Sequence, residues 1–153
     1  MVPDDLITIQ AEPIEIGRVS VFDPSAGGVA LFLGTTRAEC HPDGRELVAL
    51  DYEAYVEMAD RQLRDLAAQA RVKWPIVKLA IVHRTGRVAL GEPSVVIAVA
   101  CPHRGEAFEA CRWIIDTLKE DVAIWKKEIW ADGSGSWVHP SSDPLSPEGR
   151  GLG

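Results

Sequence analysis

Cysteine is scarce in this sequence, and the three that occur follow no pattern associated with a cross-link or a metal. Cys40, Cys101 and Cys111 are odd in number and form neither a CxxC pair nor a Cys/His spacing suited to zinc. We therefore expect reduced thiols and no structural zinc site, as in a protein that stays in a reducing compartment.

Positive charge is also in the minority. The 153 residues contain 16 lysines and arginines against 23 aspartates and glutamates, which gives a formal net charge of −7. An acidic protein is repelled by the phosphates of nucleic acids and of anionic membranes, so neither is an expected partner. A local basic pocket that takes a small anion remains compatible with this balance.

Two kinds of apolar segment are absent as well. No hydrophobic run approaches the length that spans a bilayer, and the N-terminus, MVPDDLITIQ, lacks the basic start and apolar stretch of a secretory signal. We therefore expect a cytoplasmic protein.

A hydrophobic content of 46% suits one domain, which we predict at 1–139. The remaining residues, 140–153, have the composition of a disordered tail.

The apolar residues that are present recur at strand and helix periods, with no internal repeat. Strands are predicted at 5–10, 29–33, 46–55, 76–82 and 95–99, followed by a hairpin of 124–130 and 137–139 around a turn at 132–135. Helices are predicted at 56–72 and 105–122, and a short helix is favoured over a loop at 12–22. Turns are predicted at 83–88 and 90–93, and a mobile polar loop at 38–45.

The same periods predict which faces are buried. One helix has its apolar stripe at Ala59, Leu63, Leu66, Ala67 and Ala70, and the other at Phe108, Cys111, Ile115, Leu118 and Val122. In the strand at 46–55 the buried face is predicted to hold Val48, Leu50, Tyr52 and Ala54. The apolar run at 95–99 is typical of a strand buried on both faces.

Basic residues stand at both ends of the second long helix. His103 and Arg104 follow directly after a strand that ends at Cys101-Pro102, and a strand end that meets a helix start favours an anion site. Arg112, Lys119 and Lys126 are seven residues apart and would lie along one line if the helix continued that far. The alternative is that Lys119, Lys126 and Lys127 are ordinary solvated surface residues, some of them paired with Asp116 or Glu120.

Two further positions could bind an anion, the segment 34–37 and His83. Gly34-Thr35-Thr36-Arg37 follows a strand and has the backbone N–H groups and the guanidinium to bind a phosphate, although the same residues are also typical of a strand exit. His83 at a strand end either titrates or binds an anion, or else it makes a structural hydrogen bond.

Five motifs in this order resemble one known family over about Ile7 to His139, namely that of the large, catalytic subunit of molybdopterin synthase. The motifs are FLGTTR at 32–37, LDYEAY at 50–55, HRTG at 83–86 with Gly91-Glu92, PHR at 102–104 with FEA at 108–110, and Lys119 followed by IWKKE at 124–128. Each motif alone is weak, whereas five in one colinear order are specific.

The resemblance implies a fold, a reaction and partners. The fold is an α/β hammerhead of the α+β type, a mostly antiparallel sheet packed with two main helices plus a small β subdomain. Two large subunits form a central homodimer. Each receives the Gly-Gly C-terminus of a small ubiquitin-like sulfur carrier, whose thiocarboxylate gives sulfur to cyclic pyranopterin monophosphate and so forms the dithiolene of molybdopterin. The family uses no metal or redox cofactor.

The resemblance also implies roles for single residues. Both the carrier end and the substrate phosphate are anionic, so cations must line the pocket that brings them together. Lys119 is expected to meet the carrier tail, and Lys126 to act beside it on the substrate. The expected anchors for phosphate and pterin are Arg37, His103 and Arg104, and Phe32 is expected to form a wall of the site.

This sequence departs from the family pattern at a few positions. Several relatives offer an arginine across the dimer just after the final hairpin, a role that is absent here or falls to His139. Ala123 stands where proline is common, so a longer continuous helix is conceivable. Cys40 invites a sulfur relay, but the family needs no persulfide. Two other functions stay open: a binding module of the same fold without catalysis, and an acylphosphatase-like phosphohydrolase whose phosphate loop is 34–37.

Overall fold

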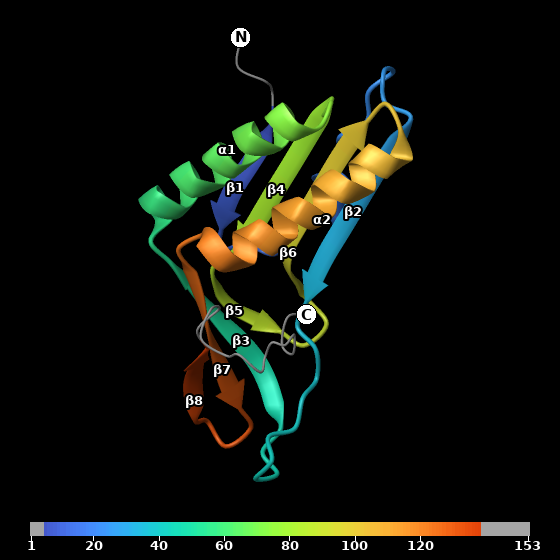
Figure 1. Ribbon diagram of the computed structural model, residues 1–153. Coiled ribbons are helices and arrows are strands. Elements are labelled where there is room, and N and C mark those ends of the chain that lie inside the picture. Colours follow the sequence, from blue (N-terminus) through green and yellow to red (C-terminus); the bar gives the residue numbers. More distant parts are fainter. Residues whose placement is uncertain (1–4, 139–153) are drawn as a thin grey trace.

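The computed structural model describes residues 5–138 as two four-stranded sheets, one of which carries both long helices (Figure 1). The elements are β1 (Leu6–Gln10), η1 (Ile16–Arg18), β2 (Gly28–Thr35), β3 (Leu47–Ala54), α1 (Val56–Lys73), β4 (Lys78–Arg84), β5 (Gly86–Ala89), β6 (Pro93–Cys101), α2 (Arg104–Asp121), β7 (Ile124–Trp130) and β8 (Gly135–Val138). The helix-covered sheet has the order β1-β4-β6-β2, and the small sheet has the order β5-β3-β7-β8. Both are antiparallel throughout except for the parallel pair β1 and β4, which confirms the predicted fold class.

The main core lies between the helix-covered sheet and the two helices that cross one of its faces (Figure 1). Strand β6 is buried from Ser94 to Cys101, as its unbroken apolar run predicts. The predicted stripe of α1 is confirmed at all five positions. The helix ends where Trp74 precedes Pro75, because a residue before proline disfavours helical backbone.

Helix α2 differs from its prediction at both ends. Its buried face contains Ala107, Ala110, Cys111, Ile114, Ile115 and Leu118. The prediction that Phe108 belongs to this stripe is wrong: small residues beside it face the core, and Phe108 itself is 66% exposed. The helix ends at Asp121, and Val122 caps it by donating its N–H to the carbonyl of Leu118. A helix that continues to Lys126 is therefore ruled out.

The small sheet contains the predicted final hairpin, in which β7 and β8 are paired. The predicted buried face of β3 is right at Leu50 and wrong at its start, where Leu47 and Ala49 are buried instead. A register shift between these two residues breaks the strict alternation. The predicted turn at 83–88 is also wrong in part, since β4 runs to Arg84 and β5 begins two residues later.

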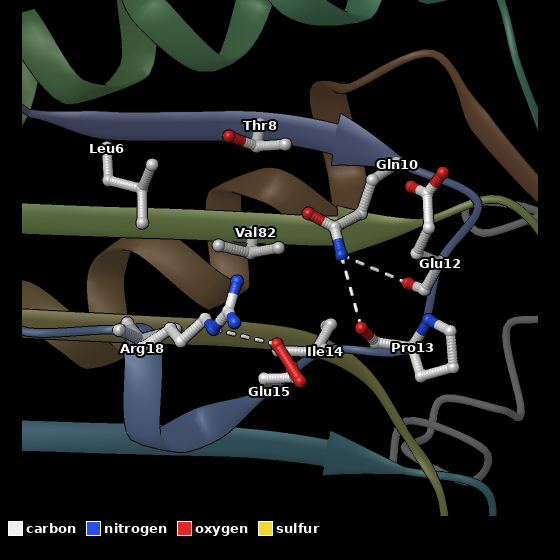
Figure 2. Close-up of a pocket in the computed structure, with 10 residues that line it drawn as sticks. Leu6, Thr8, Gln10, Glu12, Pro13, Ile14, Glu15, Arg18 and Val82 are labelled. Atoms are coloured by element: carbon white, nitrogen blue, oxygen red, sulfur yellow. Dashed lines mark hydrogen bonds and ion pairs between the residues drawn. The ribbon is translucent and has the colours of Figure 1, made fainter.

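The helix favoured at 12–22 is reduced to the single turn of η1. Pro13 disfavours helical backbone in the residue before it, and the side chain of Gln10 donates to the carbonyls of Glu12 and Pro13 instead. The segment crosses the sheet face opposite the helices and packs Val21 over a second small core. A hollow of about 520 Å³ remains between this segment and β1 (Figure 2).

Candidate functional site

Lys119 and Lys126 lie close together near the connection between α2 and β7. Lys119 lies in the last turn of the helix, and Val122 and Ala123 connect this helix to β7, on which Lys126 is the third residue. The pKa of Lys119 is lowered from 10.5 to about 8, mainly by burial and also by the positive charge of Lys126. Two half-buried ammonium groups therefore share one small region.

Lys126 lies among charges of both signs. Its pKa is lowered first by burial, while Glu128 and Glu39 raise it and Arg37 lowers it again. Arg37 follows β2 on the helix-covered sheet, and its guanidinium lies 3.7 Å from the carboxylate of Glu39. The structure thus brings Arg37 near Lys126 from a distant part of the chain.

Glu128 is a member of this cluster that the sequence prediction missed. It is half-buried, and its pKa is raised by burial and by Glu39 while Lys126 opposes the shift. The signal was present in the sequence, because residues two apart on a strand share a face and Glu128 is two residues after Lys126.

His83 forms part of the buried floor next to Lys119. Its Nδ1 lies 2.8 Å from the carbonyl oxygen of Arg84, so this nitrogen carries the proton and donates it. The pKa of His83 is lowered from 6.5 to about 4, mainly by burial; the hydrogen bond to Arg84 opposes this shift, and the charge of Lys119 contributes to it. His83 is therefore neutral at pH 7 and makes the structural hydrogen bond that was its alternative prediction.

Phe32 lies on β2, five residues before Arg37. It is half-buried and packs against the main core, and its ring is near the backbone of Gly34, where an added Cβ would lie 3.4 Å from the ring.

Thr36 follows the end of β2 and donates its backbone N–H to the carbonyl of Glu92 at 3.2 Å. This N–H is not free for a phosphate, which counts against the acylphosphatase-like loop at 34–37.

His103 and Arg104 do not join the lysines within one chain. They stand at the N-terminal end of α2, and 15 residues of helix separate Arg104 from Lys119, about 22 Å at 1.5 Å per residue. Both are exposed: the side chain of His103 is 86% accessible and lies 3.8 Å from the carboxylate of Glu106. Arg112 likewise points to solvent, paired with Asp116, so the predicted line of three cations is wrong.

The loop at 38–45 lies against the final hairpin. Arg45 donates to the hydroxyl of Ser134 at 2.6 Å, and the ring of His41 meets the ring of Trp130 edge-on. Cys40 is exposed and its thiol lies 3.6 Å from the carbonyl of His41. Mobility of this loop stays a prediction, and His139 lies outside the described residues.

The arrangement can hold an anion and stabilise negative charge that develops on it. Within residues 5–138 no group of three or more His, Cys, Asp and Glu side chains could hold a metal ion. No helix in the same range is long and apolar enough to cross a membrane. The hollow of Figure 2 is separate from this cluster, because none of the residues that line it belongs to the cluster. Arg18 in its lining is paired with Glu15 at 2.9 Å (Figure 2).

Comparisons with known proteins agree on one family. The family model described as MoaE protein matches residues 9–121. The molybdopterin synthase catalytic subunit of Thermoplasma volcanium is 52% identical over 114 residues, which cover 74% of this chain and 82% of the relative. That of Rattus norvegicus is 42% identical over 137 residues, covering 88% of this chain and 68% of the relative.

Solved structures agree with the sequence comparisons. Molybdopterin synthase from Staphylococcus aureus superposes with a TM-score of 0.79 at 35% identity, over 85% of this chain and 94% of that one. A complex of subunits 1 and 2 of the molybdopterin-converting factor from Helicobacter pylori gives 0.69 at 19% identity, over 95% and 97%, and shows the same fold.

Proposed function

The chain belongs to the MoaE family of molybdopterin synthase catalytic subunits, and from this premise we propose that its Lys119 and Lys126 carry out the sulfur transfer. The chain acts as a sulfurtransferase in molybdenum cofactor biosynthesis. The donor is the thiocarboxylated C-terminus of a small ubiquitin-like carrier, and the acceptor is cyclic pyranopterin monophosphate. The observation that carries the proposal is the pair of half-buried lysines, one with a pKa lowered to about 8.

Each lysine has a role that follows from charge. The thiocarboxylate sulfur attacks a carbon of the substrate and takes the place of an oxygen substituent, so that the carrier is held as an acyl thioester. Water then adds to the acyl carbon, the bond from this carbon to sulfur breaks, and the carrier leaves with an ordinary carboxylate. Lys119 stabilises the anionic tail and the oxyanion that forms on this carbon, since a fixed cation in a partly dry site is worth more than one in water. Lys126 acts on the substrate as a charge stabiliser or proton donor. Arg37 binds phosphate or pterin, and Phe32 closes the wall.

The proposed partner is a small carrier subunit. The complex of subunits 1 and 2 from Helicobacter pylori has a large subunit of this fold, which supports a two-protein enzyme. A Gly-Gly tail is narrow and extended, so it can approach a half-buried lysine more easily than a folded surface would.

We propose that a second copy of the chain supplies His103 and Arg104 to the region of the two lysines. Strand β2 is an edge strand, and it exposes Val29 and Leu31 by 43% and 51%. Antiparallel pairing of two β2 edges about a twofold axis would bring the start of one strand to the end of the other. A Cβ added at Gly28 would lie 2.8 Å from the Cα of Arg104, so the start of β2 is in contact with the N-terminus of α2. Pairing of the two β2 edges would therefore also bring the N-terminus of α2 close to the other copy.

The proposed dimer thereby completes the site. His103 and Arg104 of one copy would reach the region of Arg37, Lys119 and Lys126 in the other copy. In this dimer, the roughly 22 Å of α2 that separates Arg104 from Lys119 of its own chain would not prevent the two residue types from lining one pocket. A single domain at 1–139 and a cytoplasmic location remain predictions of the sequence.

Reconstitution tests the function directly. The purified chain is mixed with cyclic pyranopterin monophosphate and a small carrier that ends in a Gly-Gly thiocarboxylate, and molybdopterin is measured as its fluorescent oxidation product. We expect product with this carrier and none with the same carrier ending in an ordinary carboxylate. Tight binding of the carrier without turnover would favour the binding module instead.

A further inference from the structure

Tyr52 is the side chain through which the two sheets meet beside the lysines. Its ring packs against the main core and also against the small core of Leu47, Leu50 and Trp130. Tyr52 pairs in register with Lys126 between β3 and β7, so the two side chains are neighbours on one face of the small sheet. The position of this ring therefore bears on the position of Lys126.

The hydroxyl of Tyr52 starts a short chain of hydrogen bonds into the helix-covered sheet. It donates to the hydroxyl of Ser94 on β6 at 3.2 Å, and Ser94 donates to the carbonyl of Gly34 on β2 at 3.3 Å. Burial raises the pKa of Tyr52, so the phenol keeps its proton and remains a donor. This series of hydrogen bonds ends at Gly34, three residues before Arg37.

The ring of Tyr52 is held on its other side by His83. The two rings meet edge-on, with centroids 5.2 Å apart and planes at 73°. His83 cannot turn away without losing the hydrogen bond from its Nδ1 to the carbonyl of Arg84. Tyr52 therefore has a fixed neighbour from β4 as well as from β6.

We propose that Tyr52 is a positioning residue for sulfur transfer, because its hydroxyl bond to Ser94 fixes the small sheet, which carries Lys126, against the helix-covered sheet, which carries Arg37. The inference rests on the proposed function and adds a residue to it. Lys126 and Glu128 belong to one sheet, and Lys119 belongs to the helix layer on the other. The distance between the catalytic cations therefore depends on how the sheets are joined.

The test removes single hydroxyl groups. Tyr52→Phe keeps the ring and deletes the bond to Ser94, and the expected loss in kcat is about tenfold to a hundredfold, since small misplacements of reacting groups have effects of this size. KM for the carrier and for cyclic pyranopterin monophosphate should not change. Tyr55→Phe is the matched control, because Tyr55 is the other of the 2 tyrosines and its side chain is exposed.

A second variant checks that the hydroxyl chain is responsible. Ser94→Ala should reduce kcat as much as Tyr52→Phe does. The double variant should lose no more than either single one, because both delete the same link. Independent losses that multiply in the double variant would contradict the proposal.

The pH profile gives a signal that general loosening of the fold would not. When Lys126 moves away, its charge contributes less to the low pKa of Lys119, and the alkaline limit of kcat should rise above about 8. The charged and titratable groups facing the two lysines are His83 from β4, Glu128 from β7, and Arg37 and Glu39 from the segment after β2. None of these groups is altered by Tyr52→Phe.

The outcomes separate this inference from the proposed function. Wild-type kcat and an unmoved alkaline limit in Tyr52→Phe would overturn the role of Tyr52 while leaving the function in place. A lower melting temperature with an unchanged kcat per folded molecule would also overturn it. If the wild-type chain forms no molybdopterin with a thiocarboxylated carrier, the proposed function fails and this inference fails with it.

Discussion

The ammonium groups of Lys119 and Lys126 lie close enough that the charge of one lowers the pKa of the other. They reach this arrangement from two elements, the end of α2 and the start of β7, which are joined by two residues. Like charges held together cost free energy of folding, and they become favourable when an anion enters between them. The pair is therefore organised for a negatively charged ligand.

Removal of either lysine should abolish most of the activity. We expect Lys119→Ala and Lys126→Ala to lower kcat by about a hundredfold to a thousandfold, the usual loss when one group that stabilises an oxyanion is deleted. Lys127→Ala is the control, because Lys127 faces the other side of the strand, with its ammonium 5.5 Å from the ring of Trp137. Equal losses in all three variants, measured as molybdopterin formed per minute, would contradict the assignment.

Activity and stability should change in opposite directions at alkaline pH. The folded pKa of Lys119 is about 8 against 10.5 in an exposed lysine, so the unfolded chain binds more protons between these values and stability rises with pH there. Activity that needs the ammonium form should fall as pH passes 8. In Lys119→Arg, both effects should disappear, as followed by kcat and by urea unfolding from pH 7 to 10.

Acid should destabilise the fold through His83. Its folded pKa is about 4 against 6.5 when exposed, so the unfolded chain binds the extra proton and stability is lost as pH falls from 6.5 towards 4. The loss at pH 5 is on the order of 2 kcal/mol for one fully buried imidazole. Urea unfolding of the wild type and of His83→Gln should differ in pH dependence, whereas His103→Ala should follow the wild type because His103 is exposed.

The proposed shared site predicts complementation between inactive variants. Lys119→Ala and Arg104→Ala should each be inactive alone, and mixed dimers should regain activity because one of the two pockets then has all its native residues. Co-expression with two different tags allows the mixed dimer to be purified and assayed. A mixture of Lys119→Ala with Lys126→Ala should stay inactive, since both changes fall in the same half of the pocket.

Restored activity in that second mixture would mean that the two lysines serve different pockets. No recovery in the first mixture would mean that Arg104 acts with the lysines of its own chain, or not at all. The assay therefore measures which chain supplies each cation.

Much of the fold could be predicted because local periods dominate it. The stripe of α1 and the buried run of β6 follow directly from apolar spacing, and the family motifs indicated the reaction. Phe108 was misassigned because Ala107 and Ala110, which define the buried face, carry too little apolar surface to stand out in a pattern. The helix favoured at 12–22 failed because Pro13 and one glutamine side chain outweighed a weak helical preference.

The sequence by itself determined the two long helices, most of the strands and the residue types that the proposed anionic substrate requires. Only the tertiary structure decided which cations meet: Arg37 joins Lys126 from another sheet, whereas Arg104 lies at the far end of α2 from Lys119. The physical reason is that spacing along a chain fixes directions within one element, while the meeting of elements depends on how two sheets and two helices pack. That packing also brings Tyr52 to Ser94, 42 positions away in the sequence.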